Sequence, residues 1–186
     1  VLIRRLAPGV SARGEVVTIS TWLRALPEAI LEAEPQLSLL YAWLLIDMRD
    51  PHGAEQYLRH AEAALETTPH RTTSEGYPTS GARYPAGDTE DIRAVIGAGR
   101  SIVSVMQGDA ARAIPQARAA LDGLGDTNVR ARSIAGIALG LAYLSLGSAH
   151  EAAAAFSDVA AINRATNYAL FLLLAAVGEA CAHRMA

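Results

Sequence analysis

The sequence predicts an all-α fold built from antiparallel helical hairpins. Apolar residues make up 51% of the 186 residues, aromatic residues only 5%, and Ala and Leu dominate the apolar share. This composition favours helix over sheet, because Ala and Leu are strong helix formers whereas β-branched and aromatic residues favour strands. Apolar residues also recur at intervals of three and four, the spacing of one helix face. The turn at Gly108 and the turn at Gly147 open similar segments 39 residues apart, which indicates a repeat architecture.

The clearest hairpin spans residues 134–165, where two helical segments meet at Gly147 and Ser148. Five residues stand at the offsets of the tetratricopeptide pattern, in which one helix has L-G-x-x-Y and its partner has A-x-x-x-F: Leu139, Gly140, Tyr143, Ala152 and Phe156. The small residues let the helices approach closely, and the rings fill the space between them. The segment therefore resembles a tetratricopeptide unit, which implies a right-handed superhelix of stacked hairpins. The alternative is an ordinary hairpin in an Ala-rich bundle.

Turn signals divide the first third of the chain into two hairpins. The first covers residues 1–26, with a helical stripe on each side of Gly14. The second covers residues 35–66, and its first helix is apolar on nearly every side, which predicts an interior helix. Asp50 and Pro51 are a typical N-cap and first helical residue for the second helix of this hairpin.

The remaining segments predict two more hairpins and a half-unit. Residues 67–88 contain three Pro and three Gly, which predicts a flexible loop, either a surface connection or a contact arm. The hairpins 89–122 and 128–165 follow, with Asp109 and Asn128 as expected N-caps. Residues 167–186 form a fifth first helix, whose apolar run from Ala169 to Val177 indicates full burial. We expect a single helical-repeat domain over residues 1–186.

Composition argues against several classes of protein. The net charge of −3 provides no overall basic surface for nucleic acid, so we expect no DNA binding through this domain. All 16 basic residues are Arg, so the sequence contains no Lys. This excludes three kinds of functional lysine: one that forms a Schiff base, the lysine of a phosphate-binding loop, and the lysine of a Ser-x-x-Lys motif. The five His residues have no metal-ligand spacing, and no nucleophile motif occurs. We therefore expect no enzyme activity, metal or cofactor.

The chain also carries no signal for a membrane or an oxidising compartment. Its longest apolar runs are shorter than the about 18 residues that a membrane span needs. Cys181 is the single cysteine, so a reducing compartment is the default, and we expect a cytoplasmic location. The first residue is Val1 rather than Met, which indicates a piece of a longer protein.

A concave groove is the candidate site if the tetratricopeptide register holds. The first helix of each unit then lines this groove with a largely apolar face, which a ligand, a partner helix, another protomer or the superhelix itself must cover. Trp43 with Asp47, one turn apart and near Gln36, is an aromatic platform beside hydrogen-bonding groups, as sugars or cationic metabolites require. The alternative is that Trp43 belongs to the core. The candidate ligand-binding residues are Trp43, Asp47, Gln36, Leu39, Ile102, Met106 and Leu141.

One part of the chain resembles the helical-repeat region of MalT-type regulators of the LuxR family. In that region a G-E-x-x-T-x-x-x-W-L-x-x-L-P run precedes a P-x-L-x-x-x-Y-A-W helix. The matching residues here are Gly14, Glu15, Thr18, Trp22, Leu23, Leu26, Pro27, Pro35, Leu37, Tyr41, Ala42 and Trp43. Residues 138–156 fit the same region, whereas the 67–88 loop is longer and richer in Pro and Gly than the family pattern.

The resemblance implies a sensor domain of a cytoplasmic, ATP-dependent transcriptional regulator. In such proteins a nucleotide-binding module precedes the superhelix, and a helix-turn-helix that binds promoters follows it. The superhelix would bind a small-molecule inducer or a protein partner. The alternative is a protein-binding or self-associating scaffold without a small ligand, for which a homo-oligomer is one option.

Overall fold

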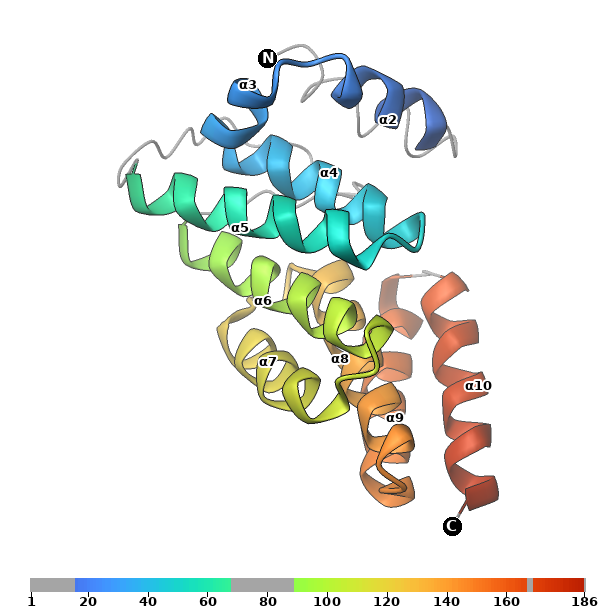
Figure 1. Cartoon of the computed structure of the whole chain (residues 1–186). Coiled ribbons are helices and arrows are strands. Elements are labelled where there is room, and N and C mark those ends of the chain that lie inside the picture. Colours follow the sequence, from blue (N-terminus) through green and yellow to red (C-terminus); the bar gives the residue numbers. More distant parts are fainter. Residues whose placement is uncertain (1–15, 68–88, 167–168, 186) are drawn as a thin grey trace. The chain divides into compact units, whose positions relative to one another are not determined.

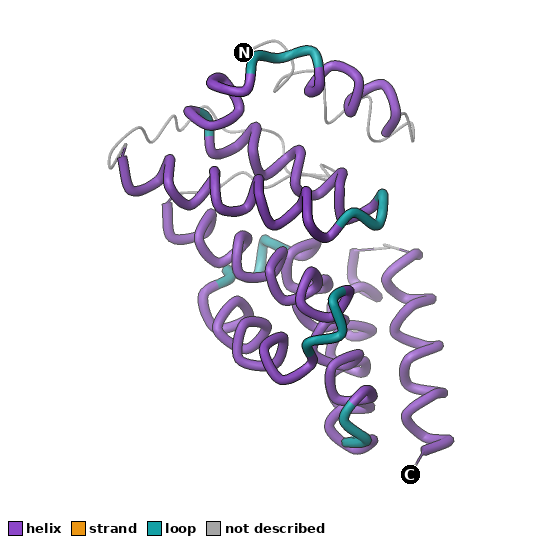
Figure 2. The backbone as a smooth tube through the Cα atoms, in the orientation of Figure 1, coloured by secondary structure: helices purple, strands orange, loops and turns teal. Residues whose placement is uncertain are grey.

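The computed structural model describes residues 16–67, 89–166 and 169–185, and every regular element in these ranges is an α-helix (Figure 1; Figure 2). The prediction of an all-α fold is therefore confirmed. The first half of the predicted 1–26 hairpin and nearly all of the predicted 67–88 loop lie outside the described residues. Contacts divide the chain into two compact units, Val1–Ile96 (the N-terminal unit) and Gly97–Ala186 (the C-terminal unit). A single superhelical domain stays a prediction.

The N-terminal unit is centred on one buried helix. It contains α2 (Val16–Arg24), α3 (Glu28–Ala33), α4 (Pro35–Asp47) and α5 (Pro51–Thr67). Helix α4 packs against α2, α3 and α5, and all ten of its residues from 37 to 46 are buried. The expected interior helix is confirmed, because a helix that is apolar on every side is stable only when other helices surround it.

The turn between α4 and α5 follows the predicted capping chemistry. Helix α4 ends as Arg49 adopts a left-handed φ of 63°, and the Asp50 amide donates to the Leu45 carbonyl at 2.9 Å. Asp50 then caps α5 by accepting a hydrogen bond from the Gly53 amide at 2.9 Å. A Cβ at position 53 would lie 2.5 Å from the Asp50 carboxylate, so a larger residue there would require this carboxylate to shift.

The C-terminal unit continues the hairpin pattern. Helix α6 (Thr89–Met106) contains the boundary between the units, and α7 (Ala110–Gly123), α8 (Val129–Ser145), α9 (Ala149–Thr166) and α10 (Ala169–Met185) follow. Helix α8 packs against α7 and α9, and α9 packs against α10. Ser104 of α6 donates a 2.7 Å hydrogen bond to Gln116 of α7. The predicted hairpins 89–122 and 128–165 stay predictions.

Two glycines and one aspartate form the predicted turns of this unit. Gly108 and Gly147 have φ of 79° and 77°, a left-handed conformation that glycine adopts without strain. Asp109 accepts a hydrogen bond from the Arg112 amide at 3.0 Å and so caps α7, as predicted. Asn128 stands at the N-cap position of α8, but its side chain makes no capping hydrogen bond. The prediction that the Asn128 side chain caps this helix is therefore wrong.

Phe156 is the central packing residue of the C-terminal unit. Its side chain is 1% exposed. A Cβ at Gly140 of α8 would lie 2.7 Å from the ring, and a Cβ at Gly178 of α10 would lie 2.5 Å from it. The ring of α9 therefore fills a gap between α8 and α10 that exists only because both positions are glycine.

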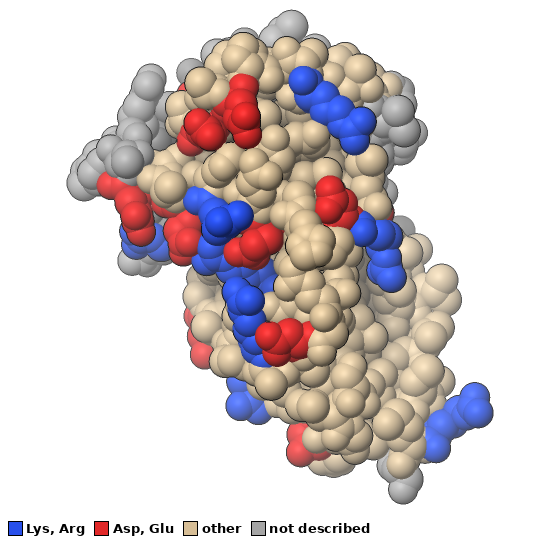
Figure 3. Space-filling model, in the orientation of Figure 1, with Lys and Arg blue, Asp and Glu red and all other residues tan. Residues whose placement is uncertain are grey.

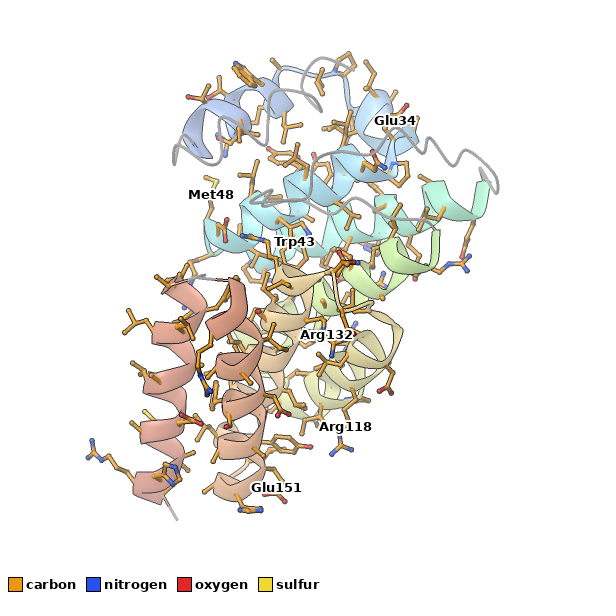
Figure 4. All side chains as sticks on the ribbon, turned by 180° about the vertical axis from the view of Figure 1, so that it is seen from behind. Glu34, Trp43, Met48, Arg118, Arg132 and Glu151 are labelled. Carbon is orange, nitrogen blue, oxygen red and sulfur yellow. The ribbon has the colours of Figure 1, made fainter. Side chains whose placement is uncertain are left out.

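Polar bonds between neighbouring helices support this packing. The Arg118 guanidinium of α7 donates to the Tyr143 hydroxyl of α8 and lies 5.8 Å from the centre of its ring. Arg132 of α8 donates to the Leu124 carbonyl at 2.7 Å, near the C-terminal end of α7 (Figure 4). In the core, the Asn163 amide of α9 donates to the Ser133 hydroxyl of α8 at 2.7 Å. These bonds link α7, α8 and α9 in sequence.

Candidate functional site

The predicted platform residues of the N-terminal unit do not share an open face. Trp43 is 1% exposed and Leu39 is fully buried, whereas Gln36 is partly exposed and Asp47 is exposed. Figure 4 shows Trp43 on α4. The prediction of an accessible aromatic platform at Trp43 is corrected, and its alternative, a core tryptophan, describes the structure. The physical reason is that α4 has helices packed against it on several sides and leaves its large apolar side chains no contact with water.

The predicted groove residues of the C-terminal unit are more accessible. Ile102 and Met106 of α6 and Leu141 of α8 are all partly exposed. Ile134 and Ile137, which also lie on α8, are buried. A lining role for Ile102, Met106 and Leu141 stays a prediction.

A cluster of aromatic rings and carboxylates lies where α3, α4 and α5 meet. We call Glu28, Glu32, Tyr41, Tyr57 and His60 the aromatic–carboxylate cluster. The Tyr41 and Tyr57 rings have centroids 4.5 Å apart, and the His60 ring meets the Tyr57 ring edge-on at 5.4 Å. The Nε2 atom of His60 lies 3.8 Å from a carboxylate oxygen of Glu32. The rings are largely covered, whereas Glu28 and Glu32 face solvent.

Two further side chains connect this cluster to its surroundings. Gln56 of α5 donates to the Glu28 carboxylate at 3.4 Å, and Arg24 of α2 donates to the Tyr41 hydroxyl at 3.3 Å. The sequence analysis missed the cluster. Its only signal is a matched spacing of four residues, with Glu28 and Glu32 on one helix facing Gln56 and His60 on another. Such spacing places two side chains on one helix face but does not identify the opposite helix.

The surroundings of Tyr57 in the cluster raise the pKa of its phenol. Burial raises the pKa of Tyr57 above its ordinary value of 10.0, and the nearby Tyr41, Glu28 and Glu32 raise this pKa further. The Nδ1 atom of His60 is buried and has no hydrogen-bond partner. With two exposed carboxylates beside aromatic rings, the cluster has the chemistry to attract a cationic group.

A stripe of large aliphatic side chains covers the outer face of α10. We call Leu170, Leu173, Leu174 and Val177 the α10 stripe; these residues are 60%, 62%, 43% and 54% exposed. Their spacing of three, four and seven places them along one helix face. In Figure 3 the visible surface over α10 lacks charged side chains along most of its length, with a basic group towards its C-terminal end.

The prediction that the 169–177 run is fully buried is therefore wrong on one side of the helix. The opposite face, formed by Phe171, Ala175, Gly178 and Ala182, is buried. Helix α10 packs on α9 and, to a smaller extent, on α8. Both lie on this inner face, so the outer leucines remain in water. The sequence shows that all faces of α10 are apolar but does not show which of them other helices cover.

The described residues contain little that indicates catalysis. Residues 16–67, 89–166 and 169–185 hold no group of three or more His, Cys, Asp and Glu that could bind a metal ion. Cys181 is exposed on α10. Within the same ranges, no helix is long and apolar enough to cross a membrane. The expectation that the chain is not an enzyme stays a prediction.

Comparison of the chain with protein-family models, with curated proteins and with solved structures finds no match. The resemblance to MalT-type regulators therefore rests on the sequence pattern alone. In the structure, the residues of that pattern that are buried, including Leu23, Leu37, Ala42 and Trp43, belong to the core of the N-terminal unit. They stabilise the helical array and are not candidates for contact with a ligand.

Proposed function

We propose that this chain is the signal-sensing and protein-interaction domain of a bacterial, cytoplasmic LuxR-family transcriptional regulator of the MalT type. The domain catalyses no reaction and contacts no DNA itself. The observation that supports the interaction role is the α10 stripe, since four large aliphatic side chains on one helix face are exposed together. The regulator context comes from the sequence resemblance in residues 14–43 and 138–156.

The size of the α10 stripe favours interaction over an incidental surface. Four side chains that are each roughly half exposed form a contiguous apolar patch of a few hundred Å², the size at which such patches often mark binding sites. Isolated exposed leucines are common on protein surfaces and need no explanation. Leu146, which is 56% exposed at the C-terminal end of α8, lies outside the α10 stripe. It provides a matched control for the experiment.

The experiment uses the complete regulator that contains this segment, with a reporter gene under its promoter. Leu173→Asp places a charge in the α10 stripe without disturbing the buried face, and we expect induced transcription to fall at least tenfold. Leu146→Asp, with the same change in chemistry and similar exposure, should leave induction unchanged. Equal induction in both variants would contradict the interaction role. The proposal that this segment belongs to a transcriptional regulator is tested by the coding sequence on either side of it. We expect a phosphate-binding loop upstream and a helix-turn-helix downstream.

A second function, the binding of a small-molecule inducer, is favoured by the aromatic–carboxylate cluster. Exposed Glu28 and Glu32 beside Tyr57 and His60 suit a cationic ligand such as an amine or an amino acid. A thermal-shift screen against sugars, amino acids, amines, aromatic metabolites and ATP tests this function, because a ligand that binds only the folded state raises the melting temperature. We expect cationic compounds alone to stabilise the chain, and Glu32→Gln to abolish the shift. A screen without any stabilising compound would contradict it.

A further inference from the structure

We draw no further inference here: the strongest candidate, the α10 stripe on the outer face of the last described helix, carries no proposal beyond the interaction role already given, because nothing in the structure shows what covers it.

Discussion

Replacing Gly178 with alanine should change the free energy of unfolding with a sign that depends on Phe156. In a helix interior, Gly→Ala normally stabilises by about 1 kcal/mol, because alanine has the better helix propensity. At Gly178, however, the new Cβ would lie 2.5 Å from two atoms of the Phe156 ring, far inside the about 3.5–4.0 Å of normal carbon contacts. The ring also lies close to Gly140 on the α8 side, where an added Cβ would be 2.7 Å from it, and this limits its movement away from Gly178.

The net cost follows from these two opposing effects. Overpacking a well-filled core costs about 1–3 kcal/mol. After subtracting the gain in helix propensity, we expect Gly178→Ala to lower the free energy of unfolding by up to about 2 kcal/mol. In a Phe156→Ala background, the three ring atoms that the new Cβ would meet at 2.5–2.6 Å are all absent, so Gly178→Ala should be neutral or stabilising. The coupling energy between the two positions should then be about 1–3 kcal/mol.

Urea unfolding followed by circular dichroism measures all four chains of this double-mutant cycle. Gly97→Ala is the matched control, because its Cβ would meet Ala120 at 3.4 Å, an ordinary contact. This variant should stabilise the chain by up to about 1 kcal/mol. If Gly178→Ala stabilises the native chain as Gly97→Ala does, then Phe156 is not confined between α8 and α10.

Other perturbations test separate parts of the structure. Trp43→Ala should lower the free energy of unfolding in urea by about 3–5 kcal/mol, because the ring is 1% exposed; a loss below about 1 kcal/mol would contradict its burial. Asn163→Ala should cost about 1–3 kcal/mol in the same assay, and much less in a Ser133→Ala background, since its buried partner would also be absent. Asp109→Ala should lower the melting temperature through the loss of about 1 kcal/mol of capping, and Asp109→Ser should largely restore it. Burial raises the pKa of Tyr57, so between its ordinary pKa of 10.0 and the raised value the folded state holds more protons. Stability is therefore complete below pH 10.0 and falls as pH rises through the raised pKa, and Tyr57→Phe should reduce this slope in urea unfolding at alkaline pH.

The hairpins and their turns could be predicted because their causes are local. Asp50 and Asp109 each cap a helix by accepting a hydrogen bond from the amide three residues further along the chain. Gly108 and Gly147 each adopt the left-handed conformation that the turn between two consecutive helices requires. The tetratricopeptide offsets also located Phe156, which is buried as that pattern implies. For these turns and for the contact of Phe156 with Gly140, the partner lies in the same hairpin, so the spacing along the chain identifies it. The contact of Phe156 with Gly178 of α10 could not be identified in this way.

Tertiary structure alone decided which apolar faces are covered and which polar groups meet. Trp43 and Leu173 both belong to helices that are apolar on every side, yet the first is buried and the second is 62% exposed. The pairing of Glu32 with His60 depends on the register between α3 and α5. The hydrophobic pattern of a sequence shows that a side chain is more stable when it is buried, but it does not show which neighbouring helix buries it. The sequence by itself therefore determined the helices and the caps at Asp50 and Asp109, and the packing of neighbouring helices decided which apolar side chains remain exposed.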